Sequence, residues 1–245
     1  MNEQILDNLR VIIDRIESAC IKCNRDLKEV RLLMATKTVP ASRIKVAFGV
    51  GQTLIGENKV QEIKEKYEEL KGVEHTCHFI GHLQTNKIKD ILKYGVSCVE
   101  SVDRLDLAEK LNQRLLFENK TLDVFIQVNT SNEESKFGVA PADAIELVKE
   151  VAKFSALRIK GLMTIGLFSA KEEKVRECFR LLKKIQQEVV GFNIPGVEMN
   201  ELSMGMSGDL EVAIEEGATI VRVGTAIFGE RVYPDSYYWD EGGAK

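Results

Sequence analysis

The chain has 245 residues with a formal net charge of −4 at pH 7, and 44% of the residues are hydrophobic, which is enough for one large core. This acidic balance, without a long lysine or arginine run, argues against nucleic acid as a partner, because binding to that polymer depends on positive charge. The N-terminus is charged throughout and no stretch approaches the roughly 18 apolar residues of a membrane helix, so we expect a cytoplasmic protein with no membrane partner.

The first predicted element is a helix over about residues 3–23, and it carries the pair Cys20 and Cys23 near its end. A thioredoxin-like site would need a strand before the pair, and a zinc site would need a second pair. The total of five cysteines is odd and favours free thiols over a disulfide framework. We therefore interpret both residues as ordinary helix cysteines.

Eight apolar, strand-like runs follow along the chain. They lie at residues 30–38, 53–58, 77–83, 96–102, 122–130, 159–166, 201–207 and 219–225. Segments with apolar residues at i, i+3 and i+4 separate them, and this alternation predicts a parallel sheet covered by helices. Eight such units predict a single-domain α/β fold, the (β/α)8 or TIM barrel, with a doubly wound open sheet as the alternative. We expect the barrel, with its N-terminal helix, to span residues 1–232 and a loosely attached tail to span 233–245.

Lys37 closes the first run, LLMATKTVP, which Pro40 prevents from continuing far. In such barrels the chemistry lies on the loops where the strands end. A lysine at the barrel mouth can be partly desolvated, which lowers its pKa and makes the neutral amine available to attack a carbonyl group. The alternative is a lysine that only reaches solvent at the strand exit.

The segment 202–231 predicts a strand, a turn, a short helix, a turn, a strand and a second short helix. Barrels often hold a phosphate with the loops after strands seven and eight and the N-terminus of a short extra helix. Gly224 and Thr225 fit that place, because glycine permits close backbone approach and threonine adds a hydroxyl donor, and Ser207 offers a second hydroxyl. Asp209 would repel a phosphate dianion, so we interpret it as a residue that caps the following helix or pairs with its dipole.

Arg222 lies inside the apolar strand TIVRVG, where a buried guanidinium is costly unless it is paired. An ion pair is one explanation, and a donor to a ligand is the other. Because arginine donates hydrogen bonds but cannot accept them, it would hold an aromatic ring nitrogen in its unprotonated form. An amine for an aldehyde, a cradle for a phosphate and a donor for a ring nitrogen together describe pyridoxal 5′-phosphate (PLP).

Six ordered blocks of the sequence also match a known family. They are LLMATKTVP, IGENKVQE (55–62), HFIGHLQTNK (78–87), VNTSNEESKFGV (128–139), GLMTIG (161–166) and the segment from SMGM to FGER (203–231). With these blocks the chain resembles the PLP homeostasis proteins, which share the barrel of the alanine racemase N-terminal domain, the fold-type III of PLP proteins. The resemblance implies that Lys37 holds PLP as a lysine aldimine and that Arg222 faces the pyridine nitrogen. It implies further cofactor-binding residues around the phosphate and along the ring: Ser207, Gly224, Thr225, Asn58, Met163 and Ser203.

The histidines and Lys136 near the predicted mouth need a separate interpretation. His78 and His82 would point the same way in a strand at 77–83, but without an acidic or cysteine ligand at a recognisable spacing we expect no metal site. Lys136, in the loop after the fifth run, is either a solvated charge or a contact near the cofactor, as its place in a family block suggests.

The resemblance also bears on catalysis. Fold-type III enzymes such as alanine racemase need a second, β-rich domain, and we expect the eight units to consume the chain by about residue 230. An unprotonated pyridine is also a weak electron sink. We therefore expect a PLP-binding protein of vitamin B6 homeostasis, a monomer that buffers PLP or passes it to apo-enzymes and lacks robust catalysis of its own. The alternatives are a low-activity amino-acid racemase with Lys37 as its base, and an aldolase-like barrel in which Lys37 attacks a sugar-phosphate ketone.

Overall fold

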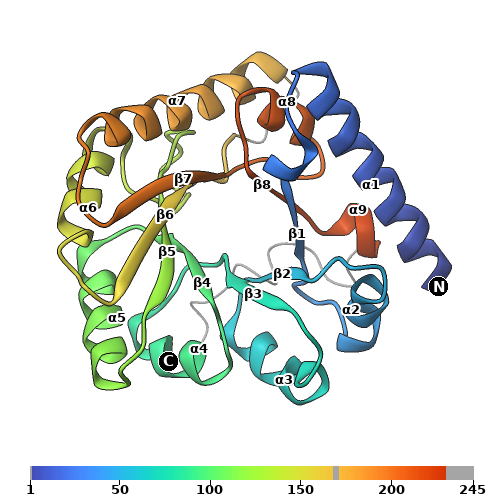
Figure 1. The fold of residues 1–245 in the computed structure, drawn as a ribbon, viewed down its shortest axis with the longest axis horizontal. Helices are drawn as coiled ribbons and strands as arrows, with labels where there is room; N and C mark the ends of the chain where they lie inside the picture. The colour runs from blue at the N-terminus through green and yellow to red at the C-terminus, as the bar shows by residue number, and fades with distance from the viewer. Residues whose placement is uncertain (1, 168–170, 230–245) are drawn as a thin grey trace.

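The computed structural model describes residues 2–167 and 171–229. Eight parallel strands form a closed barrel in which each strand pairs with its neighbour in the sequence and the last pairs with the first. Helices surround the barrel on its outside (Figure 1). The predicted single-domain (β/α)8 barrel is therefore confirmed, and the open sheet is not formed. The tail expected at 233–245 lies outside the described residues.

The strands are short and end at the barrel mouth. They are β1 (Arg31–Ala35), β2 (Leu54–Glu57), β3 (Thr76–Phe79), β4 (Cys98–Val102), β5 (Leu122–Gln127), β6 (Leu157–Met163), β7 (Val197–Ser203) and β8 (Ile220–Val223). Most end earlier than predicted, because apolar residues beyond them, such as Val39 and Leu83, are buried in the following loops and not paired in the sheet.

The seventh run was predicted at 201–207, and this placement is wrong by four residues at each end, since β7 spans Val197–Ser203. The backbone changes direction at Gly205, which has a φ of +92°. A Cβ at this position would lie 2.4 Å from the Cβ of Ala213. Only glycine fits this turn without displacing the helix behind it. The strand ends at Ser203, but the N–H of Met204 and the carbonyl of Gly205 still hydrogen-bond Ile220 and Arg222 of β8, so the chain turns away only at Gly205.

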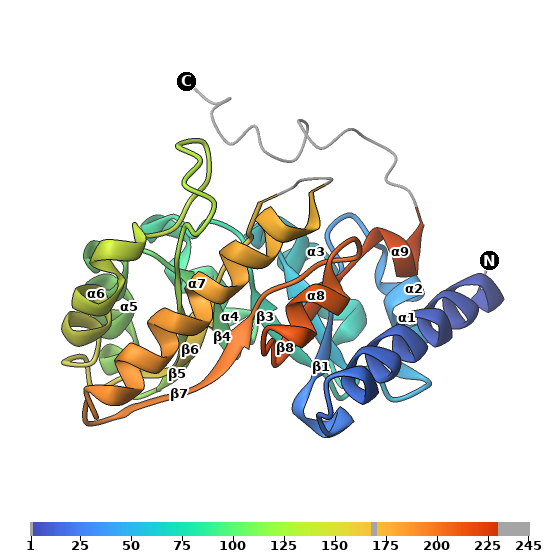
Figure 2. The same ribbon diagram turned by 90° about the horizontal axis from the view of Figure 1, so that it is seen from above.

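Helices follow the strands as the apolar spacing predicts. They are α1 (Asn2–Lys22), α2 (Ala41–Phe48), α3 (Val60–Leu70), α4 (Ile88–Lys93), α5 (Leu105–Phe117), α6 (Ala144–Val151), α7 (Glu172–Gly191), α8 (Leu210–Glu215) and α9 (Thr225–Phe228), with single 3-10 turns η1 (Leu27–Glu29), η2 (Thr85–Lys87) and η3 (Pro141–Asp143). None of the described helices is long and apolar enough to cross a membrane. The helix α1 precedes the first strand and packs against α2, α8 and α9 on one side of the barrel (Figures 1 and 2).

The cysteine pair belongs to the end of α1. Cys20 is buried in the last turn of the helix and Cys23 follows it, and both are free thiols. The thiol of Cys23 hydrogen-bonds the carbonyl of Ala19, four residues earlier. These are the contacts of ordinary helix cysteines, as the sequence predicts.

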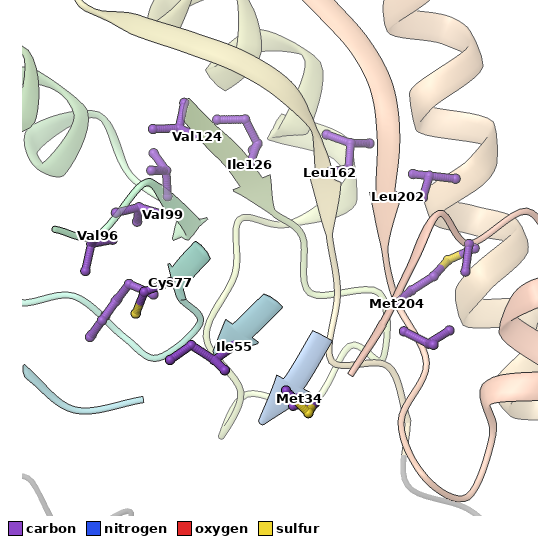
Figure 3. Close-up of a cluster of buried hydrophobic side chains, with 14 of the residues drawn as sticks. Met34, Ile55, Cys77, Val96, Val99, Val124, Ile126, Leu162, Leu202 and Met204 are labelled. Atoms are coloured by element: carbon purple, nitrogen blue, oxygen red, sulfur yellow. The ribbon is translucent and has the colours of Figure 1, made fainter. Parts of the chain in front are cut away.

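The core has two parts, which follow from the alternation of side chains along each strand. The larger part lies between the barrel wall and the helices and includes Met34, Ile55 and Leu202 (Figure 3). The smaller part fills the barrel axis, and its buried members are Leu33, Cys98, Phe125, Met163 and Ile220. Two residues further toward the mouth, Cys98, Phe125 and Ile220 are followed by the buried polar residues Glu100, Gln127 and Arg222, and Glu100 and Arg222 belong to the candidate site.

Candidate functional site

A chain of buried polar side chains crosses the barrel interior near its mouth. Arg222 on β8 donates from Nη1 to the Oγ of Ser203 on β7 (2.8 Å) and from Nη2 to the carbonyl oxygen of Thr164 (2.7 Å). The Ser203 hydroxyl in turn donates to Oε2 of Glu100 on β4 (2.5 Å). The Nδ1 of His78 on β3 lies 2.6 Å from the other carboxylate oxygen, Oε1. Four strands thus contribute to one hydrogen-bonded network.

Electrostatics explain how two charges persist inside this barrel. Burial would raise the pKa of the Glu100 carboxyl, but the hydrogen bond and charge of His78, together with the charge of Arg222, outweigh burial and lower that pKa below its ordinary value. Burial also lowers the pKa of Arg222, while the charges of Glu100 and Asp209 act in the opposite direction. The ion-pair explanation for Arg222 is therefore part of the answer, because Ser203 links it to a buried carboxylate.

Lys37 lies just beyond β1, in a turn that follows Thr36. The N–H of Thr36 still donates to the carbonyl of Gly56 (3.0 Å), so the pairing of β1 with β2 continues up to the residue before the lysine. Side chains alternate between the two faces of a strand, and Lys37 comes four residues after Leu33, which faces the barrel axis. Lys37 is therefore on the same side, and it is half-buried. The lysine is therefore placed at the mouth of the barrel and not on its outer wall.

The residues predicted to hold a phosphate lie on two adjacent loops. Gly224 precedes α9 and packs tightly on β1, because a Cβ at this position would lie 2.9 Å from the carbonyl oxygen of Ala35. Thr225 is the first residue of α9 and is exposed. Ser207 is half-buried, and Arg15 of α1 fixes its carbonyl oxygen from behind (2.9 Å).

Asp209 closes the turn before α8. Its Oδ1 accepts a hydrogen bond from the N–H of Met206 (2.5 Å), so it stabilises the preceding turn and not the helix N-terminus that the sequence suggested. Burial raises the pKa of this carboxyl above its ordinary value.

All eight predicted cofactor-binding residues lie at the mouth side of the barrel. Met163 and Ser203 are register partners on β6 and β7, and Ser203 also contacts Arg222, so these three form one cluster. Asn58 follows β2 next to the end of β1, and a Cβ on Gly81 would lie 2.1 Å from its carbonyl oxygen. The others are Lys37, Ser207, Gly224 and Thr225, each in a loop that follows a strand or at the start of the helix behind it.

Sequence reasoning missed Glu100 and the role of His78. Glu100 stands alone in the apolar run VSCVESV, which is the same signal that singled out Arg222. His78 was considered only as a metal ligand, whereas its Nδ1 contacts Glu100. Within residues 2–167 and 171–229, no group of three or more histidine, cysteine, aspartate or glutamate side chains could hold a metal ion.

Two further residues hold the loop after β5 in place. Lys136 donates to the carbonyl oxygen of Gly166 (2.8 Å) and pairs with Glu133, so it joins the loops after β5 and β6. The ring of Phe137 stacks on His82, with the ring centroids 3.9 Å apart. Lys136 is therefore more than a solvated loop charge, because it connects two loops of the mouth.

Comparison with known proteins agrees with the fold. The model of the alanine racemase N-terminal domain matches residues 26–232. A pyridoxal phosphate homeostasis protein of Aquifex aeolicus is 42% identical over 228 residues, which are 93% of this chain and 98% of that protein. The structure of PipY from Synechococcus elongatus PCC7942 with PLP bound has a TM-score of 0.77 at 30% identity, and the match covers 89% of this chain and 100% of that one. An alanine racemase of Clostridium difficile 630 has a TM-score of 0.75 at 14% identity, covering 94% of this chain and 58% of that one, and shows the shared fold alone.

The barrel and the polar mouth thus define the class, which is that of the alanine racemase N-terminal domain. Within this class the full-length identity with the relatives decides the membership. The chain belongs to the pyridoxal phosphate homeostasis protein family, as the six sequence blocks imply.

Proposed function

We propose that this protein binds PLP in the barrel mouth and acts in the homeostasis of that cofactor. The observation that carries the proposal is Arg222, which is buried inside the barrel and oriented by Ser203 and the carbonyl of Thr164, below a mouth that carries Lys37. A guanidinium has five N–H groups, and these two bonds use two of them. The remaining donors can serve a ring nitrogen. The family relationship and the PLP-bound structure of PipY give independent support.

The residues at the mouth match the three chemical groups of PLP. Bound PLP supplies an aldehyde that bonds reversibly to a primary amine. Lys37 supplies that amine, Arg222 donates to the ring nitrogen, and Asn58, Met163 and Ser203 line the ring. Gly224 has no Cβ, which lets it pack closely on Ala35, and we propose that the backbone before α9 holds the phosphate together with the hydroxyl donors of Thr225 and Ser207.

The same arrangement favours holding PLP over demanding catalysis. Arginine donates to the ring nitrogen and keeps it unprotonated, which weakens the ring as an electron sink. We propose that the protein works as a monomer in the cytoplasm and passes PLP to PLP-dependent apo-enzymes. We also propose that the barrel domain extends to residue 232, where the family match ends.

The first experiment is the visible absorption spectrum of the purified protein with added PLP, before and after borohydride. Lys37→Ala tests the amine, and Lys59→Ala is the matched control, since Lys59 is also half-buried and follows the end of β2. We expect a visible band that borohydride abolishes, the PLP mass fixed to the Lys37 peptide, and loss of both in Lys37→Ala alone. A protein that stays colourless with PLP would refute the proposal and favour the aldolase-like barrel.

A second measurement separates homeostasis from catalysis. The loaded protein is mixed with a PLP-dependent apo-enzyme, and recovery of enzyme activity is followed with and without an excess of a free-PLP scavenger. Recovery that survives the scavenger supports delivery. Steady racemisation of alanine by the protein itself, abolished in Lys37→Ala, would instead support the low-activity racemase.

A further inference from the structure

A second charged cluster lies outside the barrel, between β2 and α3, directly behind the turn that carries Lys37. It consists of Glu57 at the end of β2 and of Glu62 and Lys66 on α3. The Nζ of Lys66 donates to Oε1 of Glu57 (2.7 Å) and to Oε2 of Glu62 (3.0 Å). Glu57 is fully buried, and its other oxygen, Oε2, has no hydrogen-bond partner within the described parts of the chain.

This cluster contacts the backbone on both sides of Lys37. Before the lysine, Thr36 donates from Oγ1 to Glu57 (2.6 Å), and its carbonyl oxygen accepts from Lys66 (2.8 Å). After the lysine, the N–H of Thr38 donates to Oε2 of Glu62 (2.5 Å). The residues that flank Lys37 are therefore held by the same three side chains.

The turn needs such support because of its backbone geometry. Thr38 has a φ of +66°, in the left-handed region that a β-branched residue rarely adopts. Residues persist in this region only when the surroundings hold them there. The hydrogen bond from the Thr38 N–H to Glu62 is a direct constraint of that kind.

The cluster cannot reach the barrel axis itself. Glu57 alternates with Gly56, and Gly56 faces Leu33 of the inner core, so the Glu57 side chain points to the outer face of the wall. Lys66 belongs to the buried stripe of α3 with Val60, Ile63 and Leu70. The contacts of this cluster with the Lys37 turn are those to Thr36 and Thr38.

We infer that Glu57, Glu62 and Lys66 are positioning residues that clamp the turn on both sides of Lys37 and aim its amine at the aldehyde of PLP. The inference rests on the proposed function of Lys37. Near-attack placement of a reacting group is a large part of the rate of bond formation. Loss of the clamp therefore slows formation of the bond to the aldehyde more than it weakens binding of the ring and phosphate.

The test compares Glu62→Ala with Glu62→Gln, because glutamine keeps an acceptor oxygen for the Thr38 N–H and alanine does not. Glu118→Ala is the matched control, since Glu118 forms an i,i+4 ion pair with Arg114 at the end of α5, far from the turn in the sequence. Three quantities are measured in each variant. They are amide hydrogen exchange of the peptide covering residues 36–39 in PLP-free protein, the rate of appearance of the PLP band, and the Kd of pyridoxine 5′-phosphate, which lacks the aldehyde.

For Glu62→Ala we expect exchange in the turn to be at least about tenfold faster and the PLP band to form at least about tenfold more slowly, as for the loss of one charge-assisted hydrogen bond. We expect the Kd of pyridoxine 5′-phosphate to stay within about threefold of the wild-type value, because the residues that bind the ring and the phosphate are unchanged. Glu62→Gln restores both rates, and Glu118→Ala leaves all three quantities unchanged.

The inference is overturned if Glu62→Ala forms the PLP band at the wild-type rate, or if Glu62→Gln is as slow as Glu62→Ala. Lys66→Met gives a second test on the N-terminal side of Lys37, because it removes the donor to the Thr36 carbonyl. It should also slow formation of the PLP band and leave the Kd of pyridoxine 5′-phosphate nearly unchanged. If the wild-type protein forms no band with PLP, the proposed function has failed, whereas the exchange measurement still reports on the clamp.

Discussion

Replacing Glu100 with alanine tests whether the network inside the barrel holds its charges as the geometry indicates. Glu100 is fully buried, and its two oxygens contact His78 (2.6 Å) and Ser203 (2.5 Å). Through Ser203 it also compensates the charge of Arg222. The substitution removes the carboxylate and leaves the guanidinium without that partner.

The expected loss of stability follows from these contacts. A hydrogen bond to a charged group contributes about 1.5–3 kcal/mol, so the two contacts together give roughly 3–6 kcal/mol. Removing the desolvation of the carboxylate offsets part of this sum, and breaking one partner of a buried charge pair typically costs about 3–5 kcal/mol. We therefore expect Glu100→Ala to lower the free energy of unfolding by about 4 kcal/mol near neutral pH.

The stability difference between the wild type and Glu100→Ala should also depend on pH. The pKa of Glu100 is lowered in the folded state from the ordinary value of 4.5, so its stabilising contribution is present above pH 4.5 and is lost as the pH falls through the folded-state pKa. The difference in stability between the wild type and Glu100→Ala should thus be largest near neutral pH and should narrow below pH 4.5. Urea denaturation across this range measures it, with Glu100→Gln as the isosteric comparison.

A stability loss below about 1 kcal/mol would refute the reasoning, because a surface carboxylate gives a loss of that size. A second refutation would come from the double variant Glu100→Gln, Arg222→Met. If the two single effects simply add, the residues do not share a network, whereas contacting residues in one network show a coupling free energy of about 0.5–3 kcal/mol.

Two other predictions concern the walls of the site. Burial raises the pKa of Glu57 from 4.5 to about 7, against the opposing charge of Lys66, so the stability that protonated Glu57 contributes is lost as the pH rises through 7. Relative to the wild type, Glu57→Gln should therefore gain stability between pH 5 and pH 8, by at most about 3 kcal/mol, and a flat difference in urea denaturation would contradict this. Gly224→Ala places a Cβ 2.9 Å from the Ala35 carbonyl and should weaken binding of pyridoxine 5′-phosphate, whereas Gly208→Ala, where a Cβ meets nothing within 4 Å, is the control and should not. Equal affinities of the two glycine variants in a titration would show that the approach to β1 does not shape the phosphate site.

The barrel could be predicted from the sequence because its signal is local and repeated. Each strand is a short apolar run, each helix has an apolar stripe, and the eight repeats specify closure. The positions of Lys37 and Arg222 were also accessible, since a lysine at a strand end and a lone charge within an apolar strand are both visible in a few residues. The exact strand ends were less accessible, because apolar residues such as Leu83 continue into loops that are buried against helices.

The partners of those charges could not be read in the same way. Glu100 and Ser203 are 103 residues apart, and their contact depends on which strands face each other across the closed barrel. Lys66 occupies the apolar stripe of α3, and this misplaced charge was the available signal. Its meaning depends on Glu57, which only the packing of α3 on β2 brings within 2.7 Å.

The barrel wall separates these two charged systems, and this separation assigns them different tasks. The inner network contains Arg222, the residue that we propose donates to the ring nitrogen of PLP, so in this proposal it determines what the mouth can bind. The outer cluster contains Glu57 and Lys66 and contacts the side chain and carbonyl of Thr36 beside Lys37, so we infer that it determines how the amine is presented. Changes to the inner network should therefore alter affinity for the ring whether or not the ligand has an aldehyde. Changes to the outer cluster should slow bond formation with ligands that have an aldehyde and leave the affinity for ligands that lack one nearly unchanged.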